Sequence, residues 1–166
     1  MHSVRALFGA AAVLIGALGQ MHEQGAPNIL VPSGKVTSDA ISSDGTDPNS
    51  WDQKLDGPVA APDNHKILYQ DDDVRVLLVT VPPGEKEKVH DHRWPSILVV
   101  LGERNVEDFD ADGNRLPIHK SVPENFKWPL VLRWPPGAAH SIHNLDANKP
   151  FRAIRVEFKH GFPKPQ

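Results

Sequence analysis

The sequence has no cysteine among its 166 residues, which excludes disulfide frameworks, cysteine-ligated zinc fingers, iron–sulfur clusters and thiol nucleophiles. Neither sign of charge dominates, because 18 Lys and Arg residues stand against 21 Asp and Glu residues, a formal net charge of −3. No run of Lys and Arg is long enough to follow a phosphate backbone, so we expect no nucleic-acid partner. The length is that of one domain of ordinary size.

Proline and histidine are the residues that the chain has in quantity. The 16 prolines, about twice the usual share, are scattered and leave little room for long helices. The composition therefore predicts a globular domain rich in β-strands. The nine histidines supply the side chains from which a functional site could be built.

Residues 1–19 have the pattern of a secretory signal peptide. Arg5 precedes an uncharged apolar run over residues 6–19, and Ala17 and Gly19 are the small residues expected before a cleavage site. The run is short for a membrane span. We therefore predict an exported protein, periplasmic or secreted, with no stable membrane span after cleavage. The alternative is a cytoplasmic protein that keeps an uncleaved N-terminal segment.

The rest of the chain divides into three parts by composition. Residues 20–62 are interrupted by prolines and by a Ser, Gly and Asp cluster, which predicts an extended arm or a flexible linker with at most a short strand at 29–31. Residues 63–160 form the predicted β-domain, and 161–166 the C-terminal tail. Within this domain, eight short apolar or β-branched runs are separated by turn residues; they cover 65–70, 74–81, 89–101, 105–109, 115–119, 127–134, 140–144 and 151–159. Such spacing predicts an antiparallel sandwich or barrel.

Two histidines lie two residues apart in the segment Val-His-Asp-His. Side chains alternate between the faces of a strand, so His90 and His92 point to the same face and Asp91 points to the other. Two imidazoles on one face make half of a site for a divalent transition metal. The alternative is a pair of solvated histidines at a loop edge.

A second segment, residues 134–144, carries a proline–glycine turn followed by histidine and asparagine. Together the two segments resemble the two signature motifs of the cupin superfamily. The matching positions are Gly84, His90, His92 and Gly102 in the first motif, and Pro135, Gly137, His140 and Asn144 in the second. This resemblance implies a single small RmlC-like cupin, an all-β antiparallel barrel or jelly roll, which pairs as a homodimer. It also implies a metal held by His90, His92 and His140.

The sequence departs from the cupin pattern at one ligand position. The family's glutamate is expected after three or four intervening residues, at position 96 or 97, where Ser96 and Ile97 stand instead. Ser96 has the same parity as the two histidines, so we expect its hydroxyl in the interior in place of a carboxylate. Trp94 shares this parity and is a second candidate for the pocket wall. In the last strand, Arg152, Arg155 and Glu157 are interpreted as a charged outer face opposite the apolar residues.

Three neutral imidazoles leave the full charge on a divalent ion, whether Fe, Mn, Ni or Zn, with positions open for water or a small-molecule ligand or substrate. Cupins similar to this chain that use three histidines and no carboxylate include thiol dioxygenases and a diketone dioxygenase. The leading interpretation is therefore a mononuclear metal-dependent enzyme, an Fe(II)-type dioxygenase. The alternatives are a non-catalytic cupin that binds a metal or small molecule, and a metal-assisted isomerase or hydrolase. No residue is assigned a catalytic role, and the substrate stays open.

Overall fold

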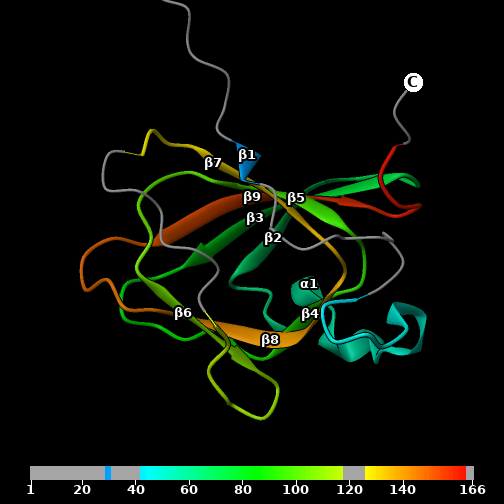
Figure 1. Cartoon of the computed structure of the whole chain (residues 1–166), viewed down its shortest axis with the longest axis horizontal. Coiled ribbons are helices and arrows are strands. Elements are labelled where there is room, and N and C mark those ends of the chain that lie inside the picture. The colour runs from blue at the N-terminus through cyan, green and yellow to red at the C-terminus, as the bar shows by residue number, and fades with distance from the viewer. Residues whose placement is uncertain (1–28, 31–41, 118–125, 164–166) are drawn as a thin grey trace, which may run out of the picture.

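A computed structural model describes residues 29–30, 42–117 and 126–163 of the chain (Figure 1). The predicted signal peptide, residues 1–19, lies outside the described residues. So do residues 118–119 of the predicted strand 115–119, and the last three residues of the predicted tail.

Two β-sheets face each other and form the fold (Figure 1). The larger sheet has the strand order β1-β7-β5-β9-β3-β2, with β1 (Ile29–Leu30), β7 (Leu130–Trp134), β5 (Ser96–Val100), β9 (Phe151–Phe158), β3 (Val74–Val81) and β2 (His65–Gln70). The smaller sheet has the order β4-β8-β6, with β4 (His90–His92), β8 (Gly137–Asn144) and β6 (Val106–Asp110). All pairings are antiparallel except that of β1 with β7. The predicted all-β jelly roll is confirmed.

The predicted strands are present except at two places, although β7 begins three residues later and β8 three residues earlier than predicted. Strands β2 and β3 have the predicted bounds, but the stretch 89–101 is divided at 93–95 into β4 and β5, which lie in different sheets. Pro95 lies at this break and cannot donate a ladder hydrogen bond, so the chain changes sheet there. Residues 115–117 form no strand; only an isolated bridge joins Arg115 to Phe109.

Alternation along β3 and β9 builds the interior between the sheets. On β3 the buried residues include Leu77, Val79 and Val81, and on β9 Phe151 and Ala153 are buried. They pack with Val100, Leu130 and Leu132 into one apolar core. Partly buried residues of the small sheet, Val106 and Ile142, close it from the other side.

At one end of β3 and β9, the inward-facing residues are charged instead of apolar. Arg75 on β3 and Arg155 and Glu157 on β9 are buried, with Glu157 fully enclosed. The predicted outer face is therefore wrong for Arg155 and Glu157, and only Arg152 is exposed. The phase of the alternation decides this, because Arg155 and Glu157 follow Phe151 and Ala153 at intervals of two. The interior thus passes from an apolar region to a polar one.

Residues 42–61 pack against this polar end. They contain two 3₁₀ turns, η1 (Pro48–Ser50) and η2 (Gln53–Leu55), and one short helical turn, α1 (Gly57–Ala60). Both carboxylate oxygens of Asp56 accept hydrogen bonds from the Arg75 guanidinium at 2.7 Å, and Ser43 N donates to Pro136 O at 2.9 Å. Within the described ranges, no helix has the length and apolar character needed to cross a membrane.

Candidate metal centre

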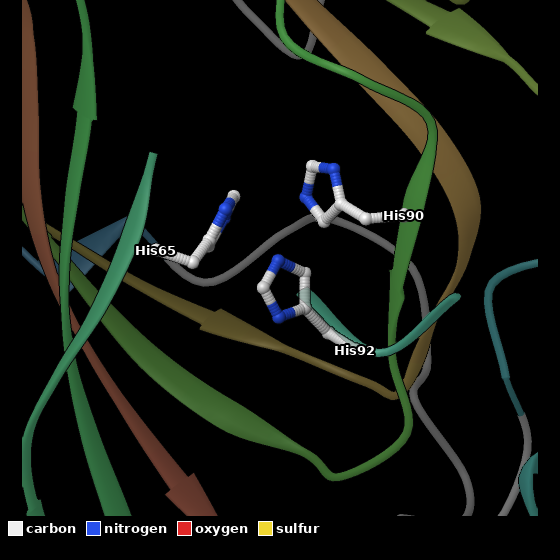
Figure 2. A group of neighbouring side chains, drawn as sticks. All are labelled: His65, His90 and His92. Carbon is white, nitrogen blue, oxygen red and sulfur yellow. The ribbon is translucent and has the colours of Figure 1, made fainter. Parts of the chain in front are cut away.

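Three imidazoles from two strands point toward one another at the polar end of the interior (Figure 2). His90 and His92 come from β4 and are buried, as their shared parity predicts. His65, the first residue of β2, joins them from the facing sheet. Its ring centroid lies 4.2 Å from that of His90 and 5.1 Å from that of His92.

These three rings have the geometry of a metal-binding group. One ring nitrogen from each of His65, His90 and His92 lies within 4.8 Å of the others. His65 Nδ1 and His90 Nε2 are buried and have no hydrogen-bond partner in the described part of the chain. Buried polar atoms are almost always paired, so a cation that accepts their lone pairs fits this site.

His140 stands beside this group. It lies on β8 opposite His90, and the two ring centroids are 4.8 Å apart. Its Nε2 is a further buried nitrogen for which the described residues offer no partner. The predicted trio of His90, His92 and His140 is thus brought together, and His65 adds a fourth imidazole that sequence reasoning missed. In the structure His65 is the one buried residue of β2, and no spacing in the sequence links it to His90 or His92.

In three of the four rings, Nδ1 lies within hydrogen-bond distance of an oxygen atom. His90 Nδ1 lies 2.9 Å from Lys88 O, His92 Nδ1 2.8 Å from Glu157 Oε1, and His140 Nδ1 2.9 Å from Asp108 Oδ1. A ring that donates from Nδ1 to an oxygen keeps its proton there and presents the Nε2 lone pair. This arrangement is typical of metal-ligating histidines.

Burial keeps the enclosed rings neutral. Desolvation lowers the pKa of His65 to about 3, and it holds the pKa of His90 and of His92 well below the ordinary value of 6.5. The Arg155 guanidinium lowers the pKa of His65 and His92 further. Only a neutral imidazole can coordinate a metal, so the rings are in the required state near neutral pH.

Glu157 links the His92 ring to a buried charge network. Its Oε2 accepts a hydrogen bond from Arg75 Nε, and Arg75 in turn is held by Asp56. Arg155 Nε lies 3.7 Å from Glu157 Oε1. Desolvation raises the pKa of Glu157 while the two guanidinium groups lower it. The orientation of His92 therefore depends on β3, on β9 and, through Asp56, on the segment before α1.

Glu87 is a second carboxylate at the site, and it was not singled out in the sequence. It lies in the loop before β4, and its side chain is fully buried. Its Oε1 accepts from Ile142 N at 3.0 Å and lies 3.8 Å from His90 Nε2. Burial raises the pKa of Glu87 to about 7.

The two predicted pocket residues have different surroundings. Ser96 is fully buried, and its hydroxyl has no partner among the described residues. It is paired in register with Glu157 on β9, so a carboxylate does lie beside the position that the cupin glutamate would occupy. Trp94 is half-buried and stacks under the Arg75 guanidinium, 4.6 Å from the ring centroid. The roles of both residues as pocket walls stay predictions.

Gly57→Ala is expected to disturb the ligand rings directly. A Cβ at Gly57 would lie 3.2 Å from His92 Cε1 and 3.3 Å from His65 Cδ2, so both rings must shift. We expect a stability loss of about 1–3 kcal/mol and metal binding weakened by about tenfold or more. Thermal melts and a metal titration would measure both. The control is Gly102→Ala, where a Cβ meets nothing within 4 Å; equal effects in the two variants would contradict the packing argument.

The metal-free protein is expected to resist acid down to about pH 4.5 and then to unfold steeply. Below pH 6.5 the unfolded chain protonates His65, His90 and His92, whereas the folded chain does not. These three rings therefore lower the free energy of unfolding as the pH falls. Each ring contributes a slope of about 1.4 kcal/mol per pH unit.

Three buried carboxyl groups act in the opposite direction. Burial raises the pKa of Glu87 to about 7 and that of Asp91 to about 6, and it raises the pKa of Glu157. The folded chain therefore binds these protons first, which offsets the histidines until the unfolded carboxyls also protonate, near pH 4.5. Below pH 4.5 only Asp91, whose ordinary pKa is 3.8, still offsets the three histidines, so stability falls steeply. Denaturant midpoints in a chelator-containing pH series would measure this, and a steep loss that begins at pH 6 would contradict it.

Comparison with known proteins gives structural similarity only. No family model and no curated protein matches the sequence. A cupin domain from Bordetella pertussis Tohama I aligns with 57% of this chain and 91% of its own, at 19% identity and a TM-score of 0.45. An RmlC-like cupin family protein with a double-stranded β-helix fold, from Methanocaldococcus jannaschii, aligns with 58% and 79%, at 16% identity and a TM-score of 0.41. The likeness is one of fold.

Proposed function

We propose that this chain, a cupin by its fold and by its two motifs, is a metal-dependent enzyme that oxidises a small molecule with dioxygen at a mononuclear, imidazole-rich centre. The observation that carries the proposal is the convergence of the buried, neutral ring nitrogens of His65, His90 and His92 within 4.8 Å. Their histidine donors suit Fe, Zn, Cu or Ni.

The residues of the chain would position the ion and leave one side open. His65, His90 and His92 would hold it from two strands, and the oxygens of Lys88 and Glu157 fix the His90 and His92 rings. A bound divalent ion would supply Lewis acidity and, if it is iron, the capacity to activate dioxygen. His140 is the most exposed ring of the four, at 17% of its side chain, so we place substrate entry on its side.

The low solvent exposure of the three ligand rings favours a second function. His65, His90 and His92 are at most 2% exposed. Metal sites that are closed to solvent are more often structural than catalytic. The alternative is therefore a non-catalytic cupin that binds a metal, with or without a small ligand.

Oxygen uptake separates the two functions. The full chain would be loaded anaerobically with Fe(II), Mn(II), Ni(II) or Zn(II) and then mixed with oxygenated solutions of small acids, thiols and diketones. The enzyme predicts oxygen consumption that requires both a redox-active metal and one substrate class, and that is lost in His92→Ala. Stoichiometric metal binding with no consumption above the buffer rate across the panel would favour the binding protein.

Export and dimerisation, both expected from the sequence, remain parts of the proposal. The export signal lies outside the described residues. For a homodimer, β2 is the outer strand of the larger sheet in the described part of the chain, and it exposes Ile67, Leu68 and Tyr69. Size-exclusion chromatography with light scattering at micromolar concentration would give the oligomeric state.

A further inference from the structure

Glu87 is a buried carboxylate that no part of the cupin motif accounts for. Its side chain is 0% exposed, and only one of its two oxygens is paired: Oε1 accepts from Ile142 N, whereas Oε2 has no hydrogen-bond partner in the described ranges. A buried carboxylate with an unpaired oxygen is unfavourable unless a positive charge or a donor reaches it. A compensating group is therefore needed at this place.

The ligand nitrogen of His90 lies close to Glu87 and also has no hydrogen-bond partner among the described residues. Glu87 Oε1 lies 3.8 Å from His90 Nε2, which is too long for a direct hydrogen bond. Two ligand atoms that share one ion at about 2.1 Å each can be up to about 4.2 Å apart. A single metal ion therefore fits between Glu87 Oε1 and His90 Nε2. It would accept the lone pair of the nitrogen, and its positive charge would compensate the buried carboxylate, whose Oε2 has no hydrogen-bond partner among the described residues.

The loop that carries Glu87 is held firmly against β8. Glu87 N donates to Ile142 O at 3.0 Å, and Asn144 N donates to Glu85 O at 2.9 Å. His140, a further ring of the cluster, lies on this same strand. These backbone hydrogen bonds hold the Glu87 carboxylate at the side of the cluster where His90 and His140 meet.

We propose that Glu87 is a carboxylate ligand on the His90 side of the metal centre, and that it replaces the glutamate which the cupin motif would place at Ser96. Glu87 lies outside the compact group of His65, His90 and His92, so it reaches the ion through its proximity to His90. This inference rests on the proposed metal site. The ligand would come from three residues before His90 instead of four residues after His92. A carboxylate beside imidazoles lowers the net charge of the centre from +2 to +1, and histidine–carboxylate donor sets suit non-haem iron.

Metal titration of the full chain tests this ligand. Co(II) and Zn(II) affinities would be measured by competition with a chromophoric chelator in the wild type, in Glu87→Gln and in Glu85→Gln. Glu85 is the matched control, because it lies on the same loop with an exposed side chain. We expect Glu87→Gln to weaken binding by about tenfold or more and to shift the Co(II) absorption bands, with Glu85→Gln like the wild type.

Each result has a distinct meaning. Unchanged affinity and spectrum in Glu87→Gln would overturn the carboxylate ligand while leaving the histidine site standing. No metal binding in the wild type would overturn the proposed function itself. If Glu87→Gln does not fold, infrared difference spectra of the wild type decide the question: a shift of a carboxylate band on Zn(II) binding supports the ligand, and the absence of a shift overturns it.

Discussion

His92→Ala is expected to reduce metal affinity by roughly 100-fold or more, the largest effect on binding that we predict. His92 is fully enclosed, its Nδ1 is fixed by Glu157, and its ring lies within 5.1 Å of His65 and 4.9 Å of His90, measured between centroids. Removal of the ring takes away one of the three nitrogens that make up the compact group. Metal content after anaerobic loading, measured by plasma emission spectrometry, gives the result.

His143→Ala is the control for this experiment. His143 lies on β8 three residues after His140 and pairs with Glu107 on β6. We expect it to bind metal like the wild type. Equal loss in His143→Ala and His92→Ala would show that general damage to the fold, and not loss of a ligand, removes the metal.

His65→Ala and His140→Ala distinguish the two possible ligand sets. The family resemblance assigns His140 with His90 and His92, whereas the compact group in the structure contains His65 in its place. If the compact group is the primary site, His65→Ala loses more affinity than His140→Ala. The reverse order would restore the arrangement that the motif implies, with His65 as a neighbour only.

Glu157→Gln is expected to destabilise the protein by about 3–5 kcal/mol, the largest effect on stability that we predict. Glu157 is fully buried between two guanidinium groups, and Arg155 would be left without its countercharge, whereas Arg75 retains Asp56. Glutamine has a single acceptor oxygen, so His92 Nδ1 and Arg75 Nε can no longer both donate to this side chain. Urea unfolding of the metal-free protein measures the free energy, and metal titration of the folded variant measures the effect on the site.

Glu103→Gln is a suitable control for Glu157→Gln. Glu103 pairs with Lys149 at 3.2 Å, but both side chains are largely exposed, at 75% and 67%. Exposed ion pairs contribute about 0–1 kcal/mol, so little change is expected. A loss of less than about 1 kcal/mol in Glu157→Gln would contradict a central role for this carboxylate.

Local patterns predicted the strands and the part of the site that lies within one strand. Alternation placed His90 and His92 on one face, and the second motif placed His140 near them. Ser96 is also interior, as its parity predicts. Each of these inferences depends only on the geometry of a strand and on short spacings.

The missed residues depend on contacts between distant segments. His65 precedes His90 by 25 positions and meets it only because the two sheets face each other. Arg155 and Glu157 were assigned to the surface because charged strand residues usually face solvent. In the interior, however, the carboxylate of Glu157 compensates the positive charges of Arg155 and Arg75. Glu87 is a loop residue whose burial depends on the pairing of its backbone with Ile142. None of these pairings leaves a periodic signal in the sequence.

X-ray absorption at the metal edge of the loaded full-length protein would show whether imidazoles hold the ion. We expect one ion per chain, with at least three imidazole nitrogens at about 2.0–2.1 Å that are recognisable from the outer-shell scattering of their rings, and loss of this signal in His92→Ala. A bound ion surrounded mainly by oxygen, or an unchanged spectrum in His92→Ala, would contradict an imidazole centre between the two sheets.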